Sequence, residues 1–145
     1  MKIERLASAA SAMDIEALRR LLGQLSGGSD GEADCCMDIE AVLANPAVRM
    51  FVGRDDDGRI VASGCLGVMD TLSGRKGHIE DVVVDSECRG KGYGRIIVEY
   101  MIEVARSMGP MELFLTSRPF RTAANALYQS LGFVRKETNC YRMEL

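Results

Sequence analysis

"DVVVDSECRGKGYGRIIVEYM" (residues 81–101) passes from an apolar run into a helical pattern through glycines at positions 90, 92 and 94. The N-terminus of a helix carries unpaired N–H groups and a partial positive charge, so a loop that enters it can bind phosphate oxygens if its backbone comes close to them. Glycines allow that approach, although alternate glycines between a strand and a helix can also be turn chemistry alone. Arg89, Lys91 and Arg95 add positive charge. The segment therefore predicts a strand, a pyrophosphate-binding loop and a helix.

Two familiar phosphate loops do not fit this spacing. In a dinucleotide-binding GxGxxG motif the third glycine would fall on position 95, which is arginine. The P-loop pattern GxxxxGK[ST] does not occur in the chain. A different class of pyrophosphate ligand is therefore expected.

Length and composition point to one domain over residues 1–145. The chain has 145 residues, of which 47% are hydrophobic, and this is enough for one core. The net charge of −3 does not suggest a broad basic surface for nucleic acid. No apolar run approaches the roughly 20 residues of a membrane span, so we expect a cytoplasmic protein that does not bind membranes. The five cysteines show no CxxC spacing, and we expect reduced, mostly buried thiols and no metal.

Outside this segment, the pattern predicts short strands alternating with helices. Apolar residues recur at helical spacing from Asp14, the expected N-cap, to Leu25, and residues 26–34 are expected to form a mobile surface loop. Further expected helices cover 37–46, 94–108 and 122–132. Expected strands cover 2–7, 48–54, 59–69, 78–85, 111–116, 133–137 and 140–145, the last two forming a hairpin about Thr138 and Asn139. This β-α-α-β-β-β-α-β-α-β-β order indicates an α/β fold on one mixed sheet.

Two blocks resemble the GNAT superfamily of acyl-CoA-dependent N-acyltransferases. Arg89, Gly92 and Gly94 fit the pattern Arg/Gln-x-x-Gly-x-Gly/Ala of its pyrophosphate loop, and "AANALYQSLGF" (123–133) resembles its late helix. The resemblance implies an α/β (α+β) fold with a single mixed, mostly antiparallel sheet flanked by helices, and acetyl-CoA as co-substrate. Residues 77–108 also resemble glucosamine-6-phosphate N-acetyltransferases, whereas 115–133 resemble uncharacterised bacterial GNAT proteins, so the acceptor stays open.

The resemblance also implies the cofactor-binding residues. The backbone of three consecutive valines would pair with the pantetheine arm, with the N–H near Val83 as oxyanion donor. Tyr128 would protonate the departing CoA sulfur, and Asn125 would bond the pantetheine or position that tyrosine. The expected cofactor contacts are Val82, Val83, Val84, Arg89, Gly90, Lys91, Gly92, Tyr93, Gly94, Arg95, Ser117, Asn125 and Tyr128.

Glu80 is the expected catalytic base. In a regular strand it shares a face with His78, Val82 and Val84, whereas Asp81 faces the other way unless the strand bulges. A carboxylate on an otherwise apolar strand is costly unless it is paired or hydrated, which favours a functional role. Asp81, His78 and ordered water remain alternative bases.

These expectations describe an N-acetyltransferase that moves an acetyl group from acetyl-CoA directly to a primary amine of a small molecule or peptide. The alternative is an acyl-CoA-binding regulatory module without turnover. Acidic residues near the site favour a cationic amine. An amino-sugar phosphate would need cations for its phosphate, which Arg118 or Arg121 would supply. A homodimer is possible, as in many members of the superfamily.

Overall fold

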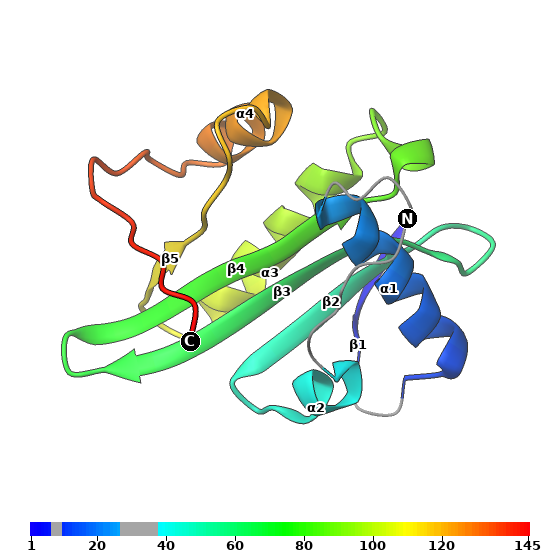
Figure 1. Cartoon of the computed structure of the whole chain (residues 1–145), viewed down its shortest axis with the longest axis horizontal. Coiled ribbons are helices and arrows are strands. Elements are labelled where there is room, and N and C mark those ends of the chain that lie inside the picture. Colours follow the sequence, from blue (N-terminus) through cyan, green and yellow to red (C-terminus); the bar gives the residue numbers. More distant parts are fainter. Residues whose placement is uncertain (7–9, 27–37) are drawn as a thin grey trace.

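The computed structural model of the chain describes residues 1–6, 10–26 and 38–145 (Figure 1). The strands are β1 (Lys2–Leu6), β2 (Val48–Arg54), β3 (Ile60–Thr71), β4 (Gly74–Val84) and β5 (Glu112–Phe114). The helices are α1 (Ala12–Ser26), α2 (Ile39–Ala44), the 3₁₀ turn η1 (Ser86–Cys88), α3 (Tyr93–Ser107) and α4 (Thr122–Ser130). Apart from Ser26, the loop expected at 26–34 lies outside the described residues.

The strands form one mixed, mostly antiparallel sheet in the order β1-β2-β3-β4-β5. Each of the first four strands pairs antiparallel with its neighbour, and β5 pairs parallel with β4. Because a parallel neighbour needs a crossover, α3 lies between β4 and β5 in the chain. The expected fold class is confirmed.

Helices cover both faces of the sheet. In Figure 1, α1 and α2 lie in front of the sheet and α3 lies behind it. Leu18 and Leu21 of α1 pack with Val83 in the cluster that we call the α1-side core. Ile97 and Met101 of α3 belong to the other cluster, the α3-side core. Adjacent residues of the central strands enter different cores because successive side chains point to opposite faces.

The start of α1 differs from the expectation. Ser11 Oγ accepts a hydrogen bond from the Asp14 N–H at 3.2 Å, and the Ser11 N–H donates to Asp14 Oδ2 at 3.3 Å. This reciprocal pair is a capping box, so Ser11 caps the helix and Asp14 lies in its first turn. Asp14 also pairs with Arg54 of β2 at 2.9 Å, which ties the start of α1 to the sheet.

The predicted C-terminal hairpin is wrong for this structure. Residues 133–145 form no strand, and the side chains of Val134, Tyr141 and Met143 are exposed. An isolated two-stranded hairpin is marginal in water, and the Thr138-Asn139 turn lacks the glycine that tight hairpins favour. We call residues 133–145 the C-terminal arm; it runs along the β5 end of the sheet in Figure 1.

The expectation of mostly buried cysteines is only partly met among the described residues. Cys65 is buried, Cys88 is half-buried and Cys140 is exposed, and all three are free thiols. Cys35 and Cys36 lie outside the described residues. Across residues 1–6, 10–26 and 38–145, no helix is both long enough and apolar enough to cross a bilayer.

Candidate active site

The strands β4 and β5 part halfway along β4. Their pairing runs only from Lys76 with Glu112 to His78 with Phe114. After β5 the chain turns away from β4 and leads to α4, whereas β4 continues to Val84 (Figure 1). The second half of β4 therefore keeps a backbone edge to which an extended ligand could bond like an added strand.

The direction of the peptide groups bears on the expected oxyanion donor near Val83. The Asp85 N–H donates to the Val61 carbonyl of β3 at 2.9 Å. Since peptide groups alternate in direction along a strand, the N–H of Val83 also points toward β3. The N–H groups of Val84 and Val82 point toward the open edge instead. On this alternation the N–H of Val83 belongs to the ladder with β3, and an oxyanion donor near Val83 would be the N–H of one of its two neighbours.

A β-bulge at Asp81 changes the face on which Glu80 lies. Glu80 pairs with Cys65, and Val83 pairs with Ser63, so Asp81 and Val82 together oppose the single residue Gly64. Asp81 has a φ of 53°, in the left-handed region that aspartate tolerates better than most residues. The expectation of a regular strand is wrong here. Glu80 shares the α1 face with Cys65, whereas Val82 packs toward the α3-side core.

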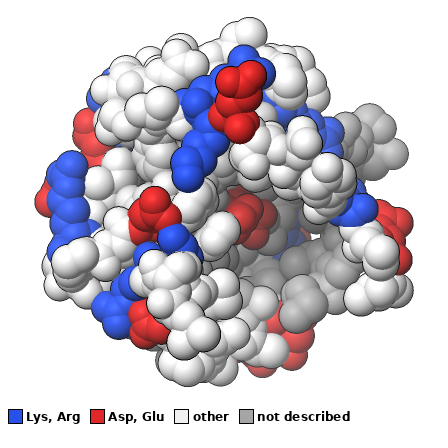
Figure 2. Space-filling view, turned by 90° about the vertical axis from the view of Figure 1, so that its left-hand side faces the viewer, with Lys and Arg blue, Asp and Glu red and all other residues white. Residues whose placement is uncertain are grey.

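The bulge brings two carboxylates near a buried thiol. Burial raises the pKa of the Cys65 thiol to about 11, and the negative charges of Asp81 and Glu80 add to the shift. Burial also raises the pKa of the Asp81 carboxyl above its usual 3.8. A carboxylate with a raised pKa is a better proton acceptor than an ordinary one. Figure 2 shows a hollow with an acidic side chain inside it on the side of the molecule toward the β3–β4 turn.

The glycines of the loop serve three local needs. Gly90 and Gly92 have φ values of 77° and 78°, which favour glycine, and Gly92 is the N-cap of α3. Gly94 lies in the first turn of α3, where an added Cβ would lie 3.6 Å from Leu127 of α4. Arg89 and Lys91 are exposed beside the loop. The loop therefore leaves backbone and cations open at a helix N-terminus, as a pyrophosphate requires.

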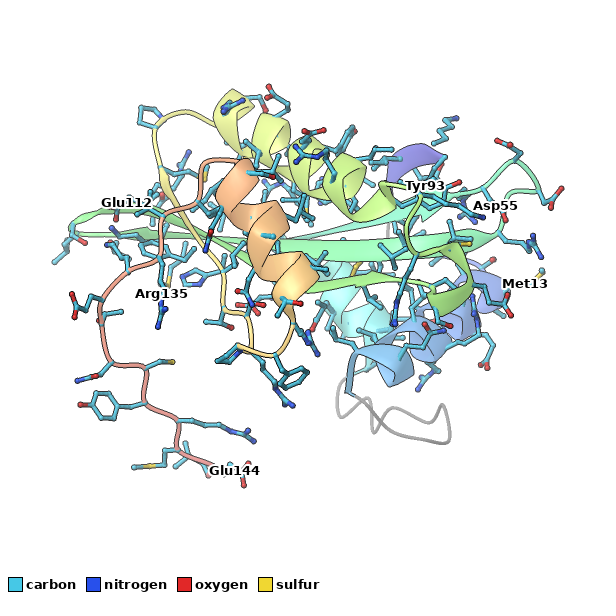
Figure 3. The ribbon with its side chains drawn as sticks, turned by 90° about the horizontal axis from the view of Figure 1, so that it is seen from above. Met13, Asp55, Tyr93, Glu112, Arg135 and Glu144 are labelled. Atoms are coloured by element: carbon cyan, nitrogen blue, oxygen red, sulfur yellow. The ribbon has the colours of Figure 1, made fainter. Side chains whose placement is uncertain are left out.

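The remaining two residues expected at the loop lie in α3. Tyr93, labelled in Figure 3, is the first residue of this helix and is half-buried. Arg95 is exposed, but its guanidinium donates to Glu99 at 3.1 Å and to the Ser130 hydroxyl at 2.6 Å. Arg95 thus ties α3 to α4 and has less freedom than Arg89 or Lys91 to meet a phosphate.

Tyr128 lies on α4, which Figures 1 and 3 place along the β4 edge beside α3. The helix ends in a Schellman motif: the Phe133 N–H donates to the Tyr128 carbonyl and the Gly132 N–H to the Gln129 carbonyl, both at 3.1 Å. The Phe133 ring also meets the Tyr128 ring edge to face, with centroids 6.1 Å apart. Gly132 and Phe133, the Gly-Phe pair of the segment 123–133, therefore hold the Tyr128 ring in place.

Burial raises the pKa of the Tyr128 phenol, and the nearby positive charge of Arg121 only partly offsets this effect. The phenol consequently stays protonated at neutral pH, as a general acid must. Arg121 itself donates to the Leu25 carbonyl at 2.7 Å, so its guanidinium already links α1 to the start of α4.

Asn125 and Ser117 lie between β5 and Tyr128. The Asn125 amide donates to the Arg118 and Arg121 carbonyls, both at 3.0 Å, and thereby closes the turn before α4. Only its Oδ1 is left to serve a ligand. The Ser117 hydroxyl is buried and has no hydrogen-bond partner among the described residues. A buried hydroxyl without a partner is costly, and a pantetheine amide would satisfy it.

Sequence reasoning missed a cationic and aromatic group beside Glu80, which we call the Phe114 cluster (Lys76, His78, Phe114 and Lys136). His78 stacks on Phe114 with centroids 5.5 Å apart, and the Nζ atoms of Lys76 and Lys136 lie 5.7 and 5.4 Å from the same ring centroid. Lys76 also pairs with Glu112. Figure 3 shows the C-terminal arm at Arg135 passing near Glu112. The alternation of residues 76, 78 and 80 along one face of β4 could have been recognised in the sequence. The contribution of Lys136 from the C-terminal arm could not.

Comparison with known proteins decides the family. Residues 16–133 match the family model described as the acetyltransferase (GNAT) family.

The chain belongs to the GNAT family.

The similar relatives are named as acetyltransferases. A probable glucosamine 6-phosphate N-acetyltransferase of Oryza sativa is 36% identical over 125 residues, which cover 80% of this chain and 73% of the relative. An IAA acetyltransferase of Azospirillum brasilense is 32% identical over 119 residues (82% and 73%). The solved glucosamine-6-phosphate N-acetyltransferase of Arabidopsis thaliana superposes with a TM-score of 0.76 at 27% identity, covering 98% of this chain and 97% of that one.

As a GNAT protein, the chain is an acyltransferase that moves an acetyl group from acetyl-CoA to an amine. The open β4 edge, the left-handed glycines and the buried Ser117 hydroxyl fit acetyl-CoA. When bound, acetyl-CoA supplies the thioester that is attacked. The expected family resemblance is confirmed, and nothing in these comparisons supports a binding module without turnover.

Proposed function

We propose that the acceptor amine binds on the α1 face of β4, beside Glu80 and Asp81, and that Tyr128 acts on the opposite side of the thioester. The amine nitrogen forms the new C–N bond as the C–S bond breaks. Before that attack the ammonium gives one proton to Glu80, directly or through water. The phenol of Tyr128 gives its proton to the departing sulfur, and the second proton that the nitrogen loses on becoming an amide returns to the phenolate. The observation that carries this proposal is the bulge, since it turns Glu80 away from the valines that line the cofactor edge.

Two carboxylates, those of Glu80 and Asp81, are candidates for the base that removes the ammonium proton. Glu80 follows His78 at two-residue spacing and is exposed, so an incoming amine can reach it. Asp81 sits at the bulge itself, with its backbone held in the left-handed conformation. We assign the base to Glu80 and electrostatic attraction of the ammonium to Asp81. The Glu80→Gln and Asp81→Asn variants separate these roles, because loss of the base lowers kcat whereas loss of attraction raises the acceptor KM.

The oxyanion donor can be assigned from the alternating direction of the N–H groups along β4. Of the N–H groups that point toward the open edge, that of Val82 lies closest to the two carboxylates in sequence. We assign it to the thioester oxygen, leaving the peptide group of Val84 to the pantetheine arm. A backbone donor held in a sheet needs no reorganisation as charge develops on the oxygen.

For the acceptor we propose an amino sugar phosphate, with glucosamine 6-phosphate as the first candidate. The relatives with that name support this choice. The Phe114 cluster supports it as well, because it brings Lys136, together with Lys76 in its pair with Glu112, to the face that also bears Glu80. An amine at Glu80 and a phosphate at the lysines would each meet an opposite charge. Arg121 is less suitable, since its guanidinium already bonds to the Leu25 carbonyl.

The test is chromatographic release of CoA from acetyl-CoA with a panel of amines at equal concentration. The panel comprises glucosamine 6-phosphate, glucosamine, a polyamine, an amino acid and a peptide N-terminus. Separation by chromatography avoids thiol dyes, which would also react with the five cysteines. Preference for glucosamine 6-phosphate over glucosamine supports the proposed acceptor. Equal rates with both amines would leave the acetyl transfer intact and remove the phosphate assignment.

We further propose a homodimer in which the C-terminal arm of each chain pairs with the partner. Tyr141, Met143 and Leu145 alternate with polar residues, as in a strand with one apolar face, and all three are exposed. The outer edge of β5 is a place where such a strand could add. Light scattering coupled to size exclusion tests this proposal: the full chain elutes as a dimer, and a chain truncated after Lys136 elutes as a monomer.

A further inference from the structure

The helix α1 holds the turn that leads from β4 into the glycine loop. Asp85 directly follows β4, and the Arg20 guanidinium of α1 donates to its Oδ2 at 2.5 Å. One helical turn later, Gln24 Oε1 accepts from the Ser86 N–H at 2.8 Å. Residues four apart share one helix face, so α1 presents both groups to the same turn. The contacts span 65 and 62 residues of sequence, which makes them tertiary links.

Asp85 is the centre of this turn. It is only 4% exposed, and its carboxylate also accepts from the Glu87 N–H at 3.2 Å as the N-cap of η1. Its own N–H is bound to Val61. The side chain thus fixes the direction in which the chain leaves β4, four residues before Arg89 begins the 89–94 loop. Movement of Asp85 would move that loop.

The negative charge of Asp85 disfavours the binding of a pyrophosphate at the same loop. Burial alone would raise the pKa of this carboxyl, but the hydrogen bonds from Arg20 and the Glu87 N–H bring it below its usual value, so Asp85 stays ionised. A buried anion near a loop that binds pyrophosphate repels the ligand unless a cation balances it. Arg20 is the cation that pairs with it among the described residues.

We propose that Arg20 is a positioning residue for the acetyl-CoA site, acting through Asp85 to hold the 85–88 turn and to cancel its charge beside the pyrophosphate. The proposal rests on the assignment of the 89–94 loop to CoA. Arg20 contacts Asp85 rather than Glu80, Asp81 or Tyr128, so its loss should affect binding of the cofactor and leave the chemical step alone.

The test is calorimetric titration of the full chain with CoA, which binds without turnover. Four proteins are compared: wild type, Arg20→Ala, Asp85→Asn and Arg20→Ala/Asp85→Asn. Asparagine keeps the oxygen that caps η1 but removes the charge. We expect Arg20→Ala to weaken CoA binding about tenfold, and the double variant to recover most of the loss. The KM for acetyl-CoA should rise in parallel, with kcat nearly unchanged.

Controls separate this role from general damage. Arg19 neighbours Arg20 on α1 and is also exposed, so Arg19→Ala should bind CoA like wild type. Thermal unfolding of each variant shows whether it is folded. If Arg20→Ala does not fold, Arg20→Lys and the double variant carry the comparison, with Arg20→Lys expected to bind more weakly than wild type because lysine lacks the guanidinium fork.

Two results overturn the inference. One is wild-type affinity in Arg20→Ala, and the other is a double variant that binds as weakly as Arg20→Ala although both are folded. Failure of the wild type to bind CoA is a different result, because it removes the assignment of the loop itself.

Discussion

Glu80 and Val82 lie on opposite faces of β4, although they are two residues apart and a regular strand would put them on one face. The extra residue, Asp81, accounts for this, with its left-handed φ of 53°. The bulge separates an acidic face, to which we assign the amine, from the apolar edge to which we assign the thioester. We therefore regard the bulge as the feature that lets one strand serve both substrates.

Replacing Asp81 by asparagine should stabilise the fold while impairing the reaction. Asparagine tolerates the left-handed conformation as aspartate does. Burial raises the pKa of Asp81 in the folded chain. The contribution of its protonated form is therefore complete below 3.8 and is lost as the pH rises through the folded pKa. Thermal unfolding should show Asp81→Asn to be more stable than wild type at neutral pH, with the difference vanishing below pH 3.8.

Valine at position 81 is the matched contrast. A β-branched residue in the left-handed region costs about 1–2 kcal/mol, so Asp81→Val should unfold at a lower temperature than Asp81→Asn. Equal stability of the two variants would show that the backbone at 81 is not constrained in this way.

Loss of the Tyr128 hydroxyl should affect turnover far more than binding. We expect Tyr128→Phe to lower kcat by about 10²–10⁴-fold, the usual contribution of a general acid. The affinity for CoA should change little, because phenylalanine keeps the packing against Phe133. Steady-state kinetics and calorimetry on the same preparation check both parts. Tyr141→Phe, in the exposed C-terminal arm, is the control.

The pH profile offers a second test of the same residue. Because burial raises the pKa of the Tyr128 phenol above 10.0, the acid should remain protonated throughout the neutral and mildly alkaline range. No loss of kcat from this group is expected below pH 10. A fall in kcat near pH 8 that disappears in a less active Tyr128→Phe variant would contradict the raised pKa.

Two neighbouring glycines should respond differently to alanine. Gly92 has a left-handed φ of 78°, so Gly92→Ala should destabilise the fold by about 1 kcal/mol and weaken CoA binding. Gly94 lies inside α3, where an added Cβ makes ordinary contact with Leu127 at 3.6 Å. Gly94→Ala should keep or raise the stability but still weaken CoA binding, if its missing side chain is what admits the phosphates. Denaturant unfolding and calorimetry separate the two effects.

The Phe114 cluster predicts a response that depends on the phosphate of the acceptor. Lys136→Ala should raise the KM for glucosamine 6-phosphate about tenfold through loss of one charged contact. The KM for glucosamine, which carries no phosphate, should stay the same. Lys2→Ala, at the far edge of the sheet in β1, controls for general charge. An equal rise for both amines would place Lys136 outside the phosphate site.

The loop, its helix and the late helix could be predicted because their signals are local. Gly90 and Gly92 mark left-handed turns, and Gly132 closes α4 in the sequence as in the structure. The family resemblance implied that the backbone of the three valines would pair with the pantetheine arm, and the pairing of β5 with β4 ends at His78, before those valines. The two helices were therefore predicted at close to their observed positions.

The errors share one cause, which is that they depend on a neighbouring strand or on a distant contact. The face of Glu80 depends on a bulge that only the register with β3 reveals. The turn around Thr138 failed as a hairpin because alternation does not supply a pairing strand. The Phe114 cluster joins β4, β5 and the C-terminal arm, which no local window contains.

The most direct measurement of the central claim is mass-spectrometric detection of the N-acetylated acceptor together with released CoA, for wild type and Glu80→Gln. With glucosamine 6-phosphate and acetyl-CoA, the wild type should form both products in equal amounts. Glu80→Gln should bind CoA normally and form both at a rate lower by about 10²-fold or more. Formation of both products by Glu80→Gln at the wild-type rate would contradict the assignment of the amine site to the α1 face of the bulge.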